Sequence, residues 1–265
     1  MHERNTFQPG NPVACNRLSA VRFHYYSDGG ELKSNGHLVV LDVAATHVAE
    51  LLHALAKDRV YIHKSRPLEE YNGNDIASMD DNNTSAFNSR PVEGTNRWSL
   101  HSYGVAIDVN PLQNPVIYPH QQEDASGGIV PGKPGTALIR PNAATDPDNN
   151  YLNRNIYRAR ADNSGFYRPG MAESVIDLFA EHGFLTWGGY WNDPLDYQHF
   201  EIGSRRFVER LYQADSPNTT NPVNGKALFG EYIAAYKTCL SNATDTVPAQ
   251  KRSYCVREVT TRYGQ

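Results

Sequence analysis

Proline and glycine are concentrated in one segment, residues 111–170, and this concentration constrains the fold more than any other feature of the sequence. Eight of the sixteen prolines lie there, together with six glycines. Such a composition is typical of disordered linkers. The segment also carries aromatic and aliphatic side chains, among them Tyr118, Ile139 and Phe166, whose burial can offset the entropy lost on ordering. We therefore expect a long, mostly irregular but packed loop, and loops of this length in compact domains are usually functional.

Helical and strand-like patterns flank this segment without regular alternation. Apolar residues recur at helical spacing in four places: residues 46–57, 175–183, 207–212 and 228–240. Short strand-like runs occupy residues 37–43, 59–63, 105–109 and 197–202. The mixed order favours an α+β fold, a small antiparallel sheet flanked by helices, over a doubly wound parallel sheet.

The overall composition excludes several classes of protein. With 265 residues, 39% of them hydrophobic, the chain can bury a substantial core without covalent staples. The formal net charge is -4, and the absence of a run of like charges argues against a nucleic-acid-binding face. No apolar run approaches the roughly 18 residues that a membrane helix needs. The N-terminus does not resemble a signal peptide, although one removed beforehand remains compatible with the sequence.

The three cysteines, Cys15, Cys239 and Cys255, allow at most one disulfide. Cys239 and Cys255 are close enough in sequence to close a local loop, which would be consistent with an oxidising compartment. Three buried thiols are the alternative. No CxxC pair is present, which argues against a cysteine metal site.

Two apolar segments contain polar residues that a half-buried strand does not need for stability. These segments are residues 99–111 and 187–201. In the first, Ser99 and His101 would share one face of a strand, whereas Asp108 lies at an odd offset from His101. Gly104 can supply the bend that turns His101 and Asp108 toward one point. Ala106, on the face of Asp108, leaves room for a metal ion.

The second segment supplies further candidates for the same site. His199 offers a third ligand, and two imidazoles with one carboxylate and a fourth position left to water are typical of a catalytic zinc site. Asp196 can face the metal if residues 193–195 form a turn, and there it would suit a general base. Glu201 shares a strand face with His199 and could orient its imidazole.

Each of these residues also has a structural interpretation. An isolated histidine in an apolar strand is usually a satisfied core residue. Asp108 could cap the turn that follows it, Asp196 could form a turn, and Ser99 could satisfy a nearby backbone group. The remaining histidines, including His47 and His182, show no ligand-like spacing, and we expect them to be structural or exposed.

The pattern Ser-x-His-x-x-Gly-x-Ala-x-Asp over residues 99–108, followed by Asp-x-x-His over residues 196–199, resembles the zinc D-Ala-D-Ala metallopeptidases. These are the VanX/VanY-type dipeptidases and carboxypeptidases and the L-alanyl-D-glutamate endopeptidases of phage endolysins. Residues 86–94 and 184–191 look like the blocks that flank the family's motifs, so the resemblance spans roughly residues 60–203. It implies the fold shared by hedgehog domains and D,D-peptidases.

The resemblance also implies roles for individual residues. It implies that Zn²⁺ is held by three ligands, His101, Asp108 and His199. It further implies that Asp196 is the catalytic base, that Arg90 polarises the scissile carbonyl or binds a substrate carboxylate, and that Ser99 contacts substrate. VanX-type dipeptidases have Glu where Asp196 stands, so the sequence favours the carboxypeptidase or endopeptidase branch.

These implications define the expected organisation and activity. We expect a zinc peptidase catalytic domain over residues 1–215, with the long loop insertion 111–170, and a C-terminal helical extension over residues 216–265 packed on it. The expected substrate is a peptidoglycan stem peptide, with D-alanyl-D-alanine carboxypeptidase activity favoured because a long covering loop tends to close one end of a cleft. Peptidoglycan endopeptidase activity, in an endolysin or an exported antibacterial effector with an immunity or inhibitor protein, is the alternative. The expected location is the periplasm or the cell wall, with neither nucleic acid nor a membrane span involved.

Two other functional classes share part of the pattern. Non-haem iron(II) oxygenases also use two histidines and a carboxylate, but their best-known pattern places the carboxylate two residues after the first histidine. A non-catalytic, hedgehog-like zinc module could dispense with the base or the arginine. Because Asp196 and Arg90 are both present, the sequence favours catalysis.

Overall fold

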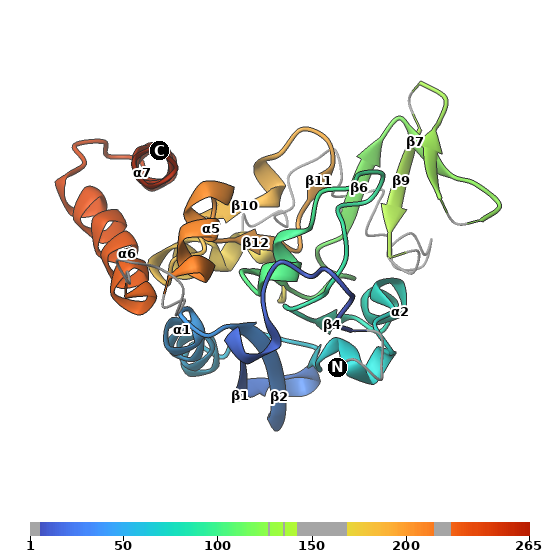
Figure 1. The fold of residues 1–265 in the computed structure, drawn as a ribbon, viewed down its shortest axis with the longest axis horizontal. Coiled ribbons are helices and arrows are strands. Elements are labelled where there is room, and N and C mark those ends of the chain that lie inside the picture. Colours follow the sequence, from blue (N-terminus) through green and yellow to red (C-terminus); the bar gives the residue numbers. More distant parts are fainter. Residues whose placement is uncertain (1–5, 127, 135, 142–168, 215–223) are drawn as a thin grey trace.

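A computed structural model describes residues 6–126, 128–134, 136–141, 169–214 and 224–265, which form a mixed α+β fold (Figure 1). The expected fold class is therefore confirmed. The helices are α1 (Ala45–Lys57), α2 (Asp75–Asp80), α4 (Ile176–Glu181), α5 (Arg205–Gln213), α6 (Gly225–Asn242) and α7 (Pro248–Tyr263). Helices α6 and α7 lie at one end of the molecule, and the segment from Val116 to Arg140 lies at the other (Figure 1).

The strands form several small sheets rather than one. The central sheet has the order β10 (Thr186–Trp187), β12 (His199–Glu201), β5 (Ala106–Asp108). A second has the order β11 (Leu195–Asp196), β6 (Val116–Pro119), β9 (Ala137–Arg140). Three pairs complete the set: β1 (Leu18–Tyr26) with β2 (Leu32–Leu41), β3 (Lys64–Ser65) with β4 (Asn83–Thr84), and β7 (Gln121–Glu123) with β8 (Ile129–Pro131). Only the β3–β4 pair is parallel among the pairs described.

The proline-rich segment contains more regular structure than its composition predicts. Four short strands, β6, β7, β8 and β9, lie within its described part, and the sequence did not predict them, although fewer than half of the described residues belong to them. Ile117 and Ile139 face each other across β6 and β9 and form a small buried cluster. Pro119 and Pro131 are the last residues of their strands, where a missing N–H disturbs the ladder least. Residues 142–168 of the same segment lie outside the described residues.

The helices with strong apolar periodicity were predictable. Helix α1 buries Val48, Leu51, Leu52 and Leu55, as the spacing predicts. The other three predicted helices correspond to α4, α5 and α6, although α4 is short and is preceded by a 3₁₀ turn over Ala172–Val175. Gly183, at φ +95°, follows α4, where a glycine is favoured.

Helix α7 and strand β1 are among the elements that the sequence patterns did not predict, and one expected strand is absent from the described residues. Helix α7 buries only Cys255, Val259 and Tyr263, three residues on one face, so its apolar pattern is sparse. Strand β1 was also missed, although its buried residues alternate along the strand. Residues 59–63 are not a strand: Arg59 has a φ of +52°, and only an isolated bridge joins Tyr61 to β1.

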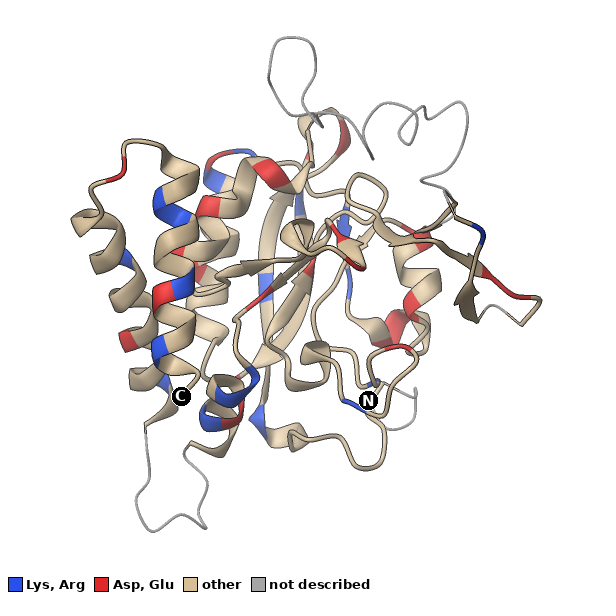
Figure 2. Cartoon of the chain, turned by 90° about the horizontal axis from the view of Figure 1, so that it is seen from above, with Lys and Arg blue, Asp and Glu red and all other residues tan. Residues whose placement is uncertain are grey.

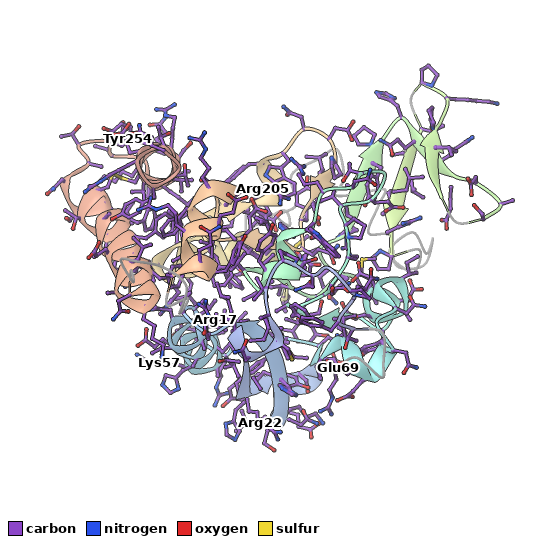
Figure 3. All side chains as sticks on the ribbon, viewed as in Figure 1. Arg17, Arg22, Lys57, Glu69, Arg205 and Tyr254 are labelled. Carbon is purple, nitrogen blue, oxygen red and sulfur yellow. A yellow bond between two sulfur atoms is a disulfide. The ribbon has the colours of Figure 1, made fainter. Side chains whose placement is uncertain are left out.

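A continuous apolar core connects the N-terminal elements to the C-terminal helices. Phe207 of α5 stacks on Tyr232 of α6 with ring centroids 4.4 Å apart. Arg17, labelled in Figure 3, ion-pairs with Asp42 at 2.7 Å and donates hydrogen bonds to carbonyl groups at the end of α5. The division of the chain into a catalytic domain, residues 1–215, and a C-terminal helical extension, residues 216–265, stays a prediction.

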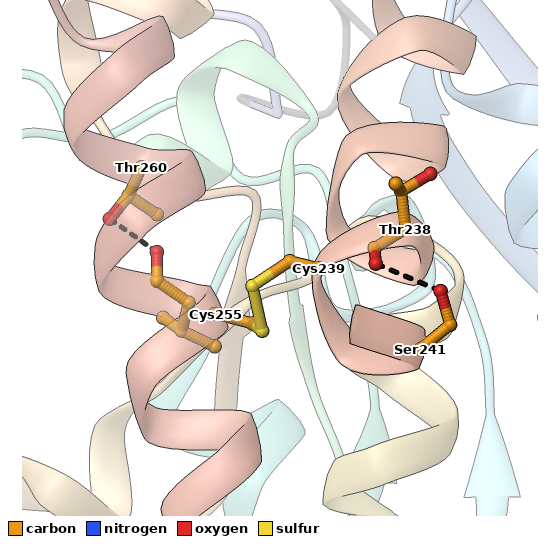
Figure 4. The surroundings of a disulfide bond; sticks show 6 residues. Thr238, Cys239, Ser241, Cys255 and Thr260 are labelled. Atoms are coloured by element: carbon orange, nitrogen blue, oxygen red, sulfur yellow. Dashed lines mark hydrogen bonds between the residues drawn. A yellow bond between two sulfur atoms is a disulfide. The ribbon is translucent and has the colours of Figure 1, made fainter. Parts of the chain in front are cut away.

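The C-terminal helices are covalently joined. A disulfide between Cys239 and Cys255 connects α6 to α7 (Figure 4). Of the two alternatives that the cysteine count left open, one disulfide or three thiols, the structure therefore has the disulfide.

Basic and acidic residues lie near one another on the helices at this end of the molecule (Figure 2). Within the described ranges, no helix is both long enough and apolar enough to cross a bilayer.

Candidate active site

His101 lies on a short 3₁₀ turn, Leu100–Tyr103, rather than on a strand. Ser99 caps this turn by accepting a hydrogen bond from the backbone N–H of His101 at 3.3 Å. The expectation that Ser99 and His101 share a strand face is therefore wrong, because the serine side chain satisfies the start of the turn. Gly104 ends the turn at φ +69°, and a Cβ there would lie 2.6 Å from the backbone nitrogen of Leu41. The bend that Gly104 was expected to supply is present.

Asp108 and His199 come from neighbouring strands. Strands β5 and β12 pair antiparallel in a register that places His199 directly opposite Asp108. Residues opposite each other in such a pair project to the same face, with Cβ atoms about 5 Å apart. The register therefore brings together two side chains that are far apart in sequence. Ala106, two residues before Asp108, shares its strand face and contributes only a methyl group to it.

The three side chains converge on one buried point. The Nε2 atom of His101 lies 3.1 Å from Nδ1 of His199 and 3.2 Å from Oδ2 of Asp108. Nδ1 of His199 lies 3.1 Å from Oδ1 of Asp108. Four ligands around Zn²⁺ at bond lengths of about 2.0–2.1 Å are separated by roughly 3.3–3.4 Å. The two ring nitrogens and the two Asp108 oxygens that face them are therefore separated by nearly the distance expected between tetrahedral ligands.

Hydrogen bonds on the outer side of each imidazole determine which nitrogen faces this point. Nδ1 of His101 must carry a proton, because its partner is the carbonyl oxygen of Ala86. Nε2 of His199 lies 3.0 Å from a carboxylate oxygen of Glu201, to which it donates. When both rings are neutral, their inner nitrogens therefore present lone pairs beside the Asp108 carboxylate. Three acceptors facing one another require a cation or a proton between them, so the donor set fits a metal ion.

The pKa shifts reflect the same accumulation of negative charge. Burial disfavours ionisation of Asp108, but the charges and hydrogen bonds of His101 and His199 outweigh it and hold the Asp108 pKa well below its usual range. Burial lowers the pKa of His199, whereas hydrogen bonds to Asp108 and Glu201 raise it, with a net rise well above the usual value. Without a metal, a proton on His199 supplies the positive charge that this cluster needs.

Asp196 lies beside the cluster at the end of β11. The chain reverses at residues 197 and 198, after Asp196, and then enters β12. Burial and the charge of Asp108 raise the pKa of Asp196 to about 6, against the opposing influence of His199 and His101. Among the described residues, its buried Oδ1 atom has no hydrogen-bond partner. The carboxyl group is therefore able to exchange a proton near neutral pH.

Arg90 is held by a carboxylate that the sequence patterns did not reveal. Its Nη2 atom lies 2.7 Å from Oδ2 of Asp75, the first residue of α2. The charges of Asp75 and, more weakly, Asp108 raise the Arg90 pKa, while burial opposes them. The influence of Asp108 places the guanidinium within electrostatic reach of the cluster. Asp75 was missed because α2 comes near Arg90 only through tertiary packing.

Aromatic side chains lie around the same site. The ring of Trp191 lies 5.2 Å from that of His199, and Trp187 donates a hydrogen bond to the carbonyl of Tyr197. Burial and the charge of Asp196 raise the pKa of Tyr118, a residue of β6. Trp191 therefore packs against a residue of the site, and the influence of Asp196 places Tyr118 near it.

A buried set of two imidazoles and one carboxylate, beside a carboxyl group of raised pKa, defines the class of site found in metal-dependent hydrolases. Residues 93–202 match the model of the M15 peptidase family, described as D-alanyl-D-alanine carboxypeptidase, which confirms the resemblance noted in the sequence. The matched segment contains Ser99 and four of the residues above, His101, Asp108, Asp196 and His199; Arg90 lies just before it. Comparison with curated proteins and with solved structures found no match.

Proposed function

We propose that this chain is a zinc-dependent peptidase that hydrolyses a peptide bond in peptidoglycan stem peptides, acting as a D-alanyl-D-alanine carboxypeptidase. The observation that carries the proposal is the convergence of three buried side chains, His101, Asp108 and His199, whose facing nitrogen and oxygen atoms lie 3.1–3.2 Å from one another. The family match over residues 93–202 supports peptidase chemistry.

In this proposal, His101, Asp108 and His199 hold the ion. Bound Zn²⁺ would supply Lewis-acid polarisation of the scissile carbonyl and lower the pKa of the attacking water. The hydrogen bonds from His101 to Ala86 and from His199 to Glu201 hold the inner ring nitrogens toward the ion.

Asp196 acts as the general base. It accepts a proton from the water that attacks the carbonyl carbon, and it returns that proton to the nitrogen of the leaving amine as the C–N bond breaks. Without a metal, burial and the charge of Asp108 raise the pKa of this carboxyl group to about 6, which favours its taking up and returning a proton near neutral pH. The unpartnered Oδ1 of Asp196 leaves one oxygen without a competing hydrogen bond among the described residues.

Arg90 supplies positive charge for the substrate. Held by Asp75, its guanidinium would stabilise the negative charge that develops on the carbonyl oxygen, or bind a substrate carboxylate. Ser99 already accepts the backbone hydrogen bond that caps the turn of His101. In this proposal, Ser99 would contact the substrate by donating the hydrogen of its hydroxyl group.

The substrate determines where the protein would act. Peptidoglycan lies outside the cytoplasm, so we propose action in the periplasm or at the cell wall. The Cys239–Cys255 disulfide supports this, because disulfides persist in oxidising compartments.

The test is hydrolysis of purified stem peptides ending in D-Ala-D-Ala, with and without a chelator, followed by mass spectrometry. Release of a single D-Ala that stops on chelation and resumes with Zn²⁺ is the expected result. Cleavage after L-Ala would replace the carboxypeptidase assignment with an endopeptidase. The absence of any chelator-sensitive product would overturn the peptidase proposal.

A further inference from the structure

A second cluster of two histidines and a carboxylate lies away from the active site. His47 and Glu50 belong to the first turns of α1, and His182 follows the last residue of α4. One ligand atom from each residue lies within 4.8 Å of the other two. The sequence spacing of these histidines did not suggest a site, because His182 reaches the cluster only when α4 packs against α1.

The distances within this cluster suit a metal ion. Nδ1 of His47 lies 3.1 Å from Oε2 of Glu50, and Nδ1 of His182 lies 4.0 Å from the same oxygen. These two values bracket the separation of roughly 3.3–3.4 Å between ligands of a tetrahedral zinc ion. A small movement of the glutamate, which is exposed, would equalise them.

The two histidines are positioned by the surrounding structure. Residues three apart on a helix lie on the same face, so α1 presents His47 and Glu50 together. The ring of His47 packs edge-on against Phe229 of α6, with centroids 5.5 Å apart. Gly183, next to His182, approaches the same phenylalanine so closely that a Cβ would lie 2.5 Å from its ring. Phe229 thus packs against the His47 ring and against the backbone next to His182.

One donor of the cluster is buried and unpaired. The Nδ1 atom of His182 is buried and, within the part of the chain that the structure describes, has no hydrogen-bond partner. Burial and the charge of Lys237 lower the pKa of His182, with Glu50 opposing them, so the ring is neutral at pH 7. A neutral imidazole can turn a lone pair toward an ion, which would satisfy the unpaired atom.

We propose that His47, Glu50 and His182 form a second binding site for Zn²⁺ or a similar divalent transition-metal ion, which ties the start of α1 to the end of α4. Imidazole and carboxylate ligands suit such ions, and water would complete the coordination. The site lies on the surface and is independent of the proposed peptidase activity.

The test is Zn²⁺ binding by the full-length protein after removal of metal, measured by calorimetry together with thermal unfolding. The wild-type chain should bind two ions, one tightly and one more weakly, and the weaker event should raise the Tm. His47→Ala and Glu50→Gln should each weaken that event at least tenfold and leave the tight event and peptide hydrolysis unchanged. Because Glu50 is exposed, E50Q should fold normally.

His53→Ala is the matched control, since His53 is an exposed histidine of the same helix outside the cluster. It should retain both binding events. A wild-type chain with no Zn²⁺ binding event that H47A and E50Q weaken would overturn the proposal, whether or not the active site binds an ion. So would a weaker event that H53A lowers as much as H47A does, because that would indicate nonspecific surface binding.

Discussion

The two clusters use the same kinds of donor in different surroundings. In the active-site cluster, the residues are buried and each imidazole is held from behind by Ala86 or Glu201. In the surface cluster, Glu50 is exposed and can exchange its contact with His47 for water. The comparison teaches that two histidines and a carboxylate do not by themselves determine the affinity for a metal ion. Burial forces three acceptors together and makes a cation necessary, whereas exposure allows the same groups to separate.

The largest effect on the buried cluster is expected from Asp108→Asn, which keeps the shape of the side chain and removes its charge. We expect loss of the tight Zn²⁺ event and a fall in kcat/KM of at least about a thousandfold, because ion and transition-state charge are both lost. Calorimetry and peptide hydrolysis measure the two effects. Retention of tight binding in D108N would remove Asp108 from the ligand set, and E50Q serves as the surface counterpart.

Asp196→Asn separates proton transfer from metal binding. We expect kcat to fall by about 10²–10⁴-fold with tight Zn²⁺ binding retained. The folded-state pKa of Asp196 is raised to about 6, so its ionisation above that pH destabilises the metal-free fold. D196N should therefore raise the Tm of the metal-free protein at pH 7.5 while abolishing most activity. An inactive variant with a lower Tm would indicate structural damage instead.

Glu201→Gln tests the hydrogen bond that orients the His199 ring. Loss of the charged acceptor should weaken the tight Zn²⁺ event by about 10–100-fold, the range typical of residues that orient a metal ligand. The weaker event should be unaffected, since Glu201 belongs to β12 and the surface cluster to α1 and α4. Equal weakening of both events would show that the two sites are coupled through the fold.

The pH dependence of hydrolysis tests the role of Asp196, which belongs to the buried site alone. A general base must be ionised, so kcat/KM should fall as the pH decreases through the pKa of Asp196. That pKa is about 6 without metal, and a nearby cation favours the carboxylate, so the apparent value in the loaded enzyme should be 6 or lower. A pH–rate profile measured with saturating Zn²⁺ checks this, and an acidic limb above pH 7 would contradict the assignment of the base.

The smallest expected effect concerns Lys237, an exposed residue of α6 whose charge acts on His182. Lys237→Gln removes a repulsive charge from the surface cluster and should tighten the weaker Zn²⁺ event by about two- to fivefold at low salt. The difference should shrink at high salt, while the tight event stays constant. No change at low ionic strength would place Lys237 too far from the ion to matter.

The ligand candidates were readable from the sequence because the motifs that carry them are local. His101 and Asp108 stand within ten residues, and Gly104 between them indicated a bend. The 3₁₀ turn itself was not predictable from a strand-like pattern, because the Ser99 cap competes with extended structure. The register that joins His199 to Asp108 is a tertiary property that no local spacing determines.

The remaining misses have a similar origin. Asp75 meets Arg90, and His182 meets His47, only through packing between elements that are separate in sequence. Helix α7 buries only three residues, and one of these, Cys255, is held by the disulfide to α6, a tertiary contact that local apolar spacing does not reveal. The strands β6 to β9 were hidden by a composition that resembles a linker, although the residues paired across them are apolar in part.

The pairing of β5 with β12 also makes metal affinity a measure of folding. Their three-residue overlap brings together segments from distant parts of the chain, so the ligand set does not exist until this long-range contact has formed. A slip of one residue would turn His199 to the opposite face of the sheet and separate it from Asp108. An ion that requires both residues would therefore bind only chains with the native strand alignment and would stabilise them against misaligned alternatives.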